Sequence, residues 1–234
     1  MNEKILGAIL AALCFGAPSF IATPAFAKDV SRIPQKQKLD SYVNDLQTNR
    51  DPNIRARAAS YLGVLKDPEA LPALHQSLIS DVDEQVRMNT ANAIARINQK
   101  SSAKKLLQAI RPNRSKTDVQ IAIIRALGNM PDHSREYLSV ITNFLRSPNP
   151  YIREAVVEAL WKIRDPRSVR VMNLLVEREK ELVVRLSLMK YIADFKSPAS
   201  IPLLKKVAAS SKEHLDVRSL ARDAIDKLEA MGLE

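Results

Sequence analysis

The side chains that could bind a metal or transfer protons are few and scattered in this sequence. The three histidines are His75, His133 and His214, and none stands at the His-x3-His or His-Glu spacing that puts two ligands on one helix face. Glu154 and Glu158 are four residues apart, so a single helix would bring both carboxylates to one side. Such a pair can act as acid and base, but it is also typical of a solvated helix surface.

Other catalytic patterns are missing from the sequence. It contains no glycine-rich phosphate loop, no nucleophile elbow and no Ser/His/Asp arrangement. Cys14 is the only cysteine and lies in an apolar N-terminal stretch, so the rest of the chain has no thiolate nucleophile or ligand. We therefore interpret the chain as not an enzyme and expect no catalytic residues, no metal and no cofactor. A lyase or hydrolase is the disfavoured alternative.

The N-terminus has the layout of a secretory signal peptide. A short start with one lysine precedes the apolar stretch 5–15, and Ala25-Phe26-Ala27 supplies small residues for cleavage after residue 27. A lipoprotein would need a small residue directly before the cysteine, but Leu13 stands before Cys14, so we do not expect lipid attachment. We expect an exported protein, periplasmic or secreted, which contacts the membrane only if this segment stays uncleaved as an anchor.

The chain is basic, with a net charge of +10 over 234 residues. Net positive charge favours anionic partners such as lipid headgroups, surface polymers or nucleic acid. A solvated, lysine-rich helix face is the alternative interpretation. The densest basic stretch supplies the candidate polyanion-binding residues Lys100, Lys104, Lys105, Arg111, Arg114 and Lys116.

A branched apolar residue followed by arginine returns every 32 or 33 residues. The pairs are Ile54-Arg55, Val86-Arg87, Ile152-Arg153, Val184-Arg185 and Val217-Arg218, and Val119-Gln120 fills the gap. Counting 4, 7, 8 and 11 residues onward from each pair gives apolar residues in all six copies, interrupted only by Thr90. These positions form one stripe of an amphipathic helix.

Each of these second helices follows a shorter amphipathic one, so the repeating unit is a helical hairpin. Asp51-Pro52, Asp67-Pro68, Asn149-Pro150, Asp165-Pro166 and Ser197-Pro198 are predicted helix starts, each with a capping side chain before the proline. Stacked hairpins complete one another's core. The sequence therefore predicts an all-α, right-handed solenoid of six hairpins over residues 37–234, after a loose lead-in at 28–36.

This pattern resembles the HEAT-repeat family in its short form, the HEAT-like repeat named after phycobilisome lyases. The resemblance rests on the apolar-Arg pair, on the prolines within the first helices (Pro72 and Pro202), and on Asp-Pro or Ser-Pro between copies. It covers essentially the whole mature chain and implies the fold but little about activity. Phycobilin lyases work inside the cell, so the export signal argues against that function here.

In such repeats the recurring arginine resembles a structural ladder, joined to acids at the turn before it. Asp51 and Asp83 stand four residues before Arg55 and Arg87, an arrangement that helix-dipole and side-chain pairing favour. The expected ladder arginines are Arg55, Arg87, Arg153, Arg185 and Arg218, with Asp51 and Asp83 as acids.

The side of each second helix opposite the stripe, at steps 2, 5 and 9 from the pair, could bind a partner on the concave face. Step 9 holds small residues in most copies but Trp161 in the fourth, which makes Trp161 a candidate anchor. The alternative is that adjacent hairpins bury this side. The candidates are Trp161, Val157, Ile121, Ile124, Met88, Leu186 and Met189, with rim charges from Arg125, Glu154, Glu158 and Lys190.

Two functional hypotheses follow. The first is a non-enzymatic scaffold or adaptor that binds a protein or peptide in the cell envelope. The second is a salt-sensitive polyanion binder that uses the basic third copy. Nucleic acid is the less favoured polyanion, because the chain is expected outside the cytoplasm and only 5% of its residues are aromatic.

Overall fold

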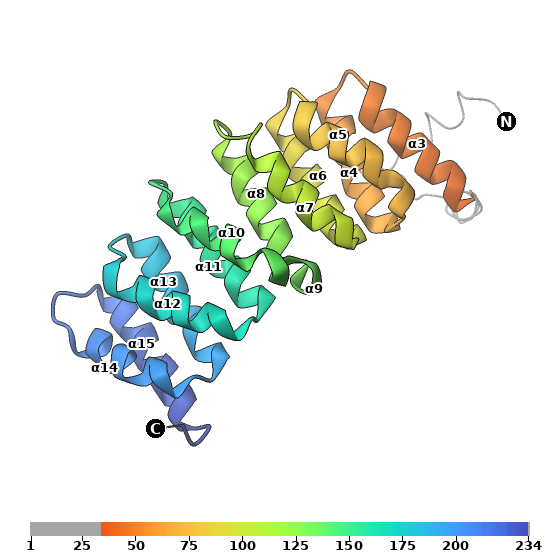
Figure 1. Cartoon of the computed structure of the whole chain (residues 1–234). Coiled ribbons are helices and arrows are strands. Elements are labelled where there is room, and N and C mark those ends of the chain that lie inside the picture. Colours follow the sequence, from red (N-terminus) through yellow and green to blue (C-terminus); the bar gives the residue numbers. More distant parts are fainter. Residues whose placement is uncertain (1–33, 234) are drawn as a thin grey trace, which may run out of the picture. The chain divides into compact units, whose positions relative to one another are not determined.

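The computed structural model describes residues 34–233, and every regular element in that range is a helix (Figure 1). Two compact units are distinguished, Met1–Ser41 and Tyr42–Glu234, and each is considered by itself. In the first unit the described residues form the opening turns of a helix, where Lys36 pairs with Asp40 at 3.4 Å. The all-α prediction is confirmed for the described part of the chain.

The predicted signal peptide, residues 1–27, lies outside the described residues, as does most of the predicted lead-in. The helix α3 begins at Gln35, two residues before the predicted start of the solenoid at residue 37. Between residues 34 and 233 no helix has the length and apolar character needed to span a membrane.

The elements follow one another as paired helices, some with a short 3-10 segment (η) attached. Their bounds are α3 Gln35–Thr48, α4 Pro52–Leu65, η1 Pro68–Ala70, α5 Leu71–Ser80, α6 Glu84–Ile97, α7 Lys100–Ile110, α8 Thr117–Gly128, α9 Pro131–Ser134, η2 Arg135–Tyr137, α10 Leu138–Asn143, η3 Phe144–Arg146, α11 Pro150–Ile163, α12 Pro166–Arg178, α13 Leu182–Ile192, η4 Ala193–Phe195, η5 Pro198–Ser200, α14 Ile201–Ala209 and α15 Leu215–Glu229.

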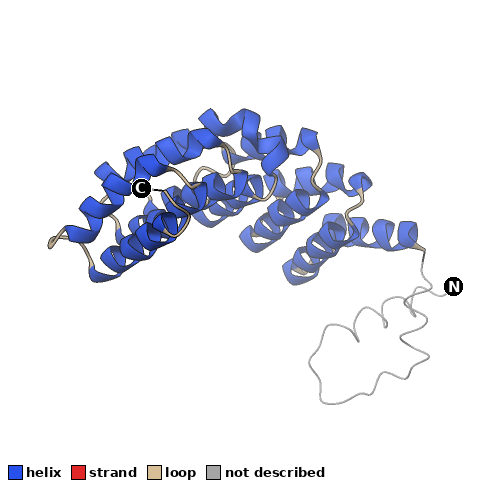
Figure 2. Cartoon of the chain, turned by 90° about the horizontal axis from the view of Figure 1, so that it is seen from below, coloured by secondary structure: helices blue, strands red, loops and turns tan. Residues whose placement is uncertain are grey.

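Within the unit that starts at Tyr42, the hairpins stack in chain order and their helices form two layers (Figure 2). The second helices make one layer, in which each contacts the next: α4, α6, α8, α11, α13 and α15. From α5 onward the first helices make the other layer, and each packs on the second helix of its own hairpin. This layering leaves one row of second helices with a side that faces away from the first helices.

The helix starts follow the predicted proline chemistry at four of five joints. The Asp51 side chain accepts a hydrogen bond from the Asn53 backbone N–H at 2.8 Å, and Asn149 accepts one from Tyr151 at 2.9 Å. Asp67 and Asp165 cap their helices in the same way. The prediction is wrong for Ser197, which makes no capping bond. Ser197 contributes only its backbone carbonyl oxygen, which accepts from the Ser200 N–H at 3.1 Å.

Four hairpins end on a residue in the left-handed conformation, and none of the four is glycine. These residues are Lys66, Asn98, Arg164 and Lys196, with φ between 52° and 57°. The third hairpin departs from the rule, because α8 ends at Gly128 and the chain then continues directly into the proline-led α9. The first helix of the fourth hairpin is correspondingly broken into α9, η2, α10 and η3.

The predicted apolar stripe forms the core between the two layers. All stripe residues are buried except five that are partly or more exposed: Ile54, Tyr61, Leu65, Tyr191 and Phe195. Thr90, the polar interruption, is fully buried and its hydroxyl lies 3.2 Å from the Ser77 hydroxyl, so the two satisfy each other. Tyr61 stacks on Tyr42 with ring centroids 5.0 Å apart.

The second helix of the last hairpin, α15, carries charged residues at positions where the earlier second helices have apolar or small ones. At steps 5 and 9, earlier copies bury residues such as Ala91 and Gly63 against the next hairpin. In α15 these positions are Arg222 and Asp226, and both are exposed. A polar outer face of this kind is typical of a capping repeat.

Candidate partner-binding surface

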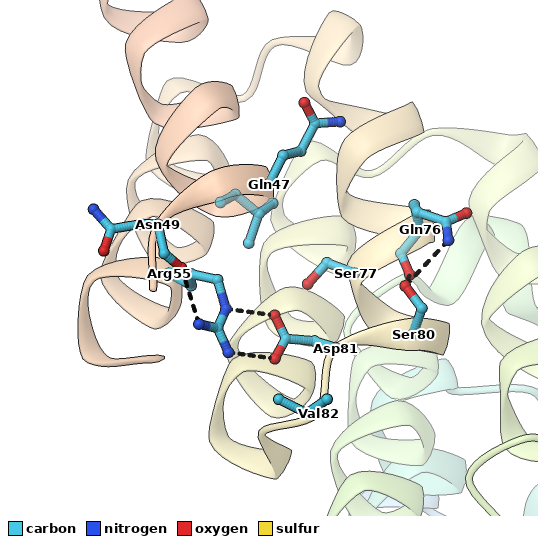
Figure 3. A pocket seen from close by; sticks show the side chains of 9 residues that line it. Gln47, Asn49, Arg55, Gln76, Ser77, Ser80, Asp81 and Val82 are labelled. Carbon is cyan, nitrogen blue, oxygen red and sulfur yellow. Dashed lines mark hydrogen bonds and ion pairs between the residues drawn. The ribbon is translucent and has the colours of Figure 1, made fainter. Parts of the chain in front are cut away.

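Except in the last copy, the repeated arginines link successive hairpins, and among the described residues none forms an ion pair with an acid of its own hairpin. The guanidinium of Arg55, at the start of α4, donates to both carboxylate oxygens of Asp81 at the end of α5, each at 2.8 Å (Figure 3). It also donates to the Asn49 carbonyl oxygen at 3.0 Å. The pair lines a hollow of about 450 Å³, in which Gln76 and Ser80 bond to each other. Burial alone would raise the pKa of Asp81, but the bonds from Arg55 hold it below its usual value.

The same contact between an arginine and the turn of the next hairpin recurs along the chain. Arg153 bonds both oxygens of Glu179 at 2.7 and 2.8 Å, and Arg185 pairs with Glu213. For Arg87 of the second hairpin the acceptor is an amide. Its guanidinium donates to the side-chain oxygen of Asn113 at 2.6 Å. Each acceptor lies at the turn between the two helices of the following hairpin.

One rung of this ladder is missing between the third and fourth hairpins. Gln120 replaces the arginine and donates to the Arg114 carbonyl oxygen of its own hairpin at 2.8 Å. The residue in the acceptor position of the fourth hairpin is Arg146, which is a cation itself. In the last hairpin, Arg218 donates to the Ala208 carbonyl oxygen at 3.3 Å.

The expected pairing of each arginine with the acid four residues earlier is not what the structure shows. Asp51 and Asp83 cap α4 and α6 instead, accepting hydrogen bonds from the backbone N–H groups of Asn53 and Val86. A helix start needs such an acceptor for its unpaired N–H groups, and the capping carboxylate is therefore engaged. The arginine side chain is left free to extend to the next hairpin.

Of the two alternatives for the outer side of the second helices, burial holds for the step 5 residues. Ile124, Val157 and Met189 are at most 1% exposed, so they pack between second helices and are not available to a partner. The small residues at step 9 are explained by the close approach of neighbouring second helices. A Cβ added to Gly128 would stand 2.8 Å from the Ala159 Cα, so α8 and α11 come together at a glycine.

Trp161 occupies the slot that holds glycine or alanine in the preceding hairpins, and it faces an equally large residue. Its ring stacks on Tyr191 of α13, with centroids 4.5 Å apart. Its indole N–H donates to an Asp194 carboxylate oxygen at 2.7 Å, and Asp194 also pairs with Lys227. Trp161 is therefore held by contacts to the next hairpin, which explains its size without a partner.

Four of the predicted candidates, Met88, Ile121, Arg125 and Glu154, gather in one hollow across three second helices. Its volume is about 410 Å³, and we call it the α6–α8–α11 hollow. It is lined by Met88 and Asn92 of α6, by Thr117, Asp118, Ile121, Ala122 and Arg125 of α8, and by Tyr151 and Glu154 of α11. Tyr151 is 59% exposed and was not among the predicted candidates. The hollow lies at the junction where the ladder has no rung.

The charged residues near the hollow are largely engaged with one another. Arg125 donates to Glu154 at 3.0 Å and to Glu158 at 2.8 Å, and Lys162 bonds Glu158 at 2.6 Å. Burial would raise the pKa of Glu158, but the two cations bring it below its usual value. The pair Glu154 and Glu158 thus joins α8 to α11, the junction without a ladder rung.

Leu186 and Lys190 are further predicted candidates that lie outside the hollow. Leu186 is half-buried on α13, and the exposed Lys190 ammonium stands 5.1 Å from the centre of the Tyr191 ring. A second hollow, of about 520 Å³, opens farther along α6. It is lined by Lys66, Asn92, Ala95, Arg96, Asn98 and Asn129, and we call it the Lys66–Arg96 hollow. Asn92 lines both hollows.

The basic third copy presents most of its predicted cations to solvent. Lys100 and Lys104 lie on α7 and Arg111 and Arg114 on the turn that follows, and all four are exposed. Lys105 is exposed beside His75, and Lys116 pairs with Glu84 at 2.7 Å. Burial, aided by Lys105, lowers the pKa of His75 to about 4. Among the described residues, no three or more His, Cys, Asp or Glu side chains come together as a possible metal site.

Comparison with known proteins identifies the family that has this architecture. The family model for HEAT repeats matches residues 40–117, 113–189 and 146–226. The chain belongs to the HEAT-repeat family. The resemblance inferred from the apolar-Arg periodicity is thereby confirmed. No curated protein matches the sequence.

Solved structures share the fold of this HEAT-repeat chain at low sequence identity. An archaeal HEAT-like repeats protein from Thermococcus onnurineus NA1 is similar with a TM-score of 0.56 and 13% identity, covering 98% of both chains. The complex of CpcE and CpcF of phycocyanin lyase from Nostoc sp. PCC7120 gives 0.50 and 16%, covering 97% of this chain and 95% of that one. An engineered protein gives 0.51 and 18%, covering 82% and 96%. At these identities the likeness concerns the fold alone.

Proposed function

We propose that this HEAT-repeat chain is a non-enzymatic scaffold of the cell envelope that binds a protein or peptide at the α6–α8–α11 hollow. The hollow carries the proposal, because it combines the apolar side chains of Met88, Ile121 and Tyr151 with a polar rim in one concave site. Buried apolar and aromatic anchors surrounded by polar groups are where binding energy concentrates in protein interfaces. Stacked hairpins are suited to extended binding surfaces of this kind.

The envelope location follows from the predicted export signal, residues 1–27. A scaffold outside the cytoplasm would meet envelope proteins directly. This location is tested by the same experiment as the binding site, since a partner trapped in living cells reports its own compartment.

The test is a photo-crosslinking amino acid placed at position 151. Tyr151 is exposed and lines the hollow, so irradiation of living cells should give one discrete crosslinked product with an exported protein. The matched control is the same amino acid at Leu174, which is 53% exposed on α12 in the other layer. Equal products from both positions, or none from position 151, would contradict the proposal.

A second function is favoured by one observation, the exposed cations of the third hairpin. Lys100, Lys104, Arg111 and Arg114 form no ion pair within residues 34–233 and could contact an anionic lipid or surface polymer. Such binding falls steeply with salt, since it releases counterions. Under this alternative, Lys104→Gln with Arg111→Gln should abolish retention on anionic vesicles, and changes in the hollow should leave it intact.

A further inference from the structure

The two hollows on the second-helix row are parts of one path along α6. Met88, Asn92 and Arg96 are spaced four residues apart, so they follow one face of the helix. Met88 lies in the α6–α8–α11 hollow, Arg96 in the Lys66–Arg96 hollow, and Asn92 in both. The rise of an α-helix puts the two ends of this path about 12 Å apart.

The ends of the path differ in chemistry. At the first end, Met88 and Ile121 supply apolar surface, and the exposed Asp118 adds a negative charge. At the second end, Lys66 and Arg96 are exposed cations that form no ion pair or hydrogen bond through their side chains among the described residues. Arg125 offers no such charge, because Glu154 and Glu158 already bind it.

The middle of the path carries an amide with open hydrogen-bonding groups. The exposed side chain of Asn92 has no partner within residues 34–233, whereas Asn89, one turn earlier, is engaged with the Ala56 carbonyl oxygen and with Gln85. An asparagine side chain has both a donor and an acceptor, so it can pair with a peptide group.

We infer that these hollows form one groove for an extended acidic peptide segment, with an apolar side chain against Met88 and Ile121 and a carboxylate between Lys66 and Arg96. The inference rests on the proposed function and adds the chemistry of the partner. An extended chain covers about 3.3 Å per residue, so the apolar residue and the acid should be separated by about four positions. Asp118 sets the direction, because it repels an acid at the apolar end.

The cations have a structural role as well, which the test must separate from binding. Lys66 follows the last residue of α4 and Arg96 lies in the last turn of α6, where positive charge complements the helix dipole. Lys196 provides a matched control. It is exposed, ends its hairpin with φ 52° against 54° for Lys66, and forms no ion pair in the described part of the chain.

The experiment selects binders from a random peptide library displayed on phage, with the purified chain as the target. We expect the selected peptides to carry Asp or Glu about four positions from a large apolar residue. A selected peptide is then synthesised with a fluorescent label, and its affinity is measured by anisotropy. Lys66→Gln with Arg96→Gln should weaken it about tenfold or more, and Lys196→Gln by less than about twofold.

A double-mutant cycle identifies the contact itself. Replacing the acid of the peptide by its amide should cost the same factor with the wild-type chain and almost nothing with the Lys66→Gln, Arg96→Gln chain. Additive losses, or selected peptides without an acid, would overturn the inference while the proposed function stands. If no peptide is enriched over selection against Ile121→Asp, both the inference and the proposed function fail.

Discussion

Arg55 and Asp81 form a two-point ion pair across 26 residues of chain, with both nitrogen–oxygen distances at 2.8 Å. Their side chains are only 11% and 7% exposed. The pair joins the start of one second helix to the turn of the next hairpin. Arg153–Glu179 and Arg185–Glu213 repeat this relationship, so the arginine period marks contacts between hairpins.

Because this pair is nearly buried, removing one partner should be costly. We expect Asp81→Asn to lower the free energy of unfolding by about 2–3 kcal/mol, since it leaves the Arg55 charge desolvated and without a counter-charge. Arg125→Gln, at a pair whose arginine is 44% exposed, should cost less than about 1 kcal/mol. Urea unfolding followed by circular dichroism measures both, and equal losses would contradict the ladder as a stabilising element.

Asp165 should make stability depend on acid pH. Its carboxylate accepts two hydrogen bonds from the Arg167 side chain, at 2.8 Å each, which lower its pKa from 3.8 to about 2, against the opposing effect of burial. A carboxyl whose pKa is lower in the folded chain adds stability that is complete above about pH 4 and is lost as the pH falls toward 2. The stability difference between wild type and Asp165→Asn should therefore shrink over that window.

The control for this titration is Asp67→Asn, which replaces a charged cap of the same type by a neutral one, at a side chain that has no arginine partner among the described residues. Its effect on the urea midpoint should change less between neutral and acid pH. If the two variants lose stability in parallel as the pH falls, the bonds from Arg167 are not the cause.

Gly128 tests the close approach of α8 and α11. Helix propensity alone predicts that Gly128→Ala stabilises the chain by up to about 1 kcal/mol. The added Cβ would stand 2.8 Å from the backbone of Ala159, and overpacking of this kind typically costs about 1–3 kcal/mol. We expect packing to dominate, so the thermal midpoint falls. Ala95→Gly at the equivalent slot should cost only about 0.5–1 kcal/mol, through backbone entropy.

We predict that the main effect of substituting Trp161 is a lower free energy of unfolding. Trp161→Phe keeps a stacked ring on Tyr191 but loses the bond to Asp194, and should cost about 1 kcal/mol. Trp161→Ala also loses the stacking and leaves a space between α11 and α13, so we expect about 2–4 kcal/mol. Circular dichroism measures both, since the variants lack the tryptophan signal. A fully stable Trp161→Ala chain would return Trp161 to the list of candidate partner contacts.

The sequence predicted the features of this fold that depend on local periodicity. The stripe that begins at Val119, for example, is buried throughout, because a helix period and a repeat period together specify which side faces the other layer. The caps at Asp51 and Asn149 were predictable for a similar reason, since each residue and its proline are adjacent in the chain. The charged outer face of α15, with Arg222 and Asp226, was not among the predictions.

The sequence could not predict features that depend on how closely neighbouring hairpins approach. The partner of Arg55 is 26 residues away and becomes apparent only once the hairpins are stacked. The small residues in the Trp161 slot made Trp161 a candidate anchor, whereas they mark close approach of neighbouring second helices, as at Gly128. Tyr151 was missed as a candidate because it lies outside the 2, 5 and 9 spacing. Its signal was an exposed aromatic directly after a helix-starting proline.

The central claim is that a protein partner binds in the α6–α8–α11 hollow, and the most direct test is the affinity of the partner crosslinked at position 151. The dissociation constant is compared for wild type, Ile121→Ser and Lys104→Gln, at low and at high salt, with Val140→Ser on α10 as the control for an exposed apolar side chain. We predict that Ile121→Ser weakens binding about tenfold or more while Val140→Ser and Lys104→Gln do not, and that binding persists at high salt. Binding that is indifferent to Ile121→Ser but lost with Lys104→Gln or with salt would contradict the account and place the site on the basic third hairpin.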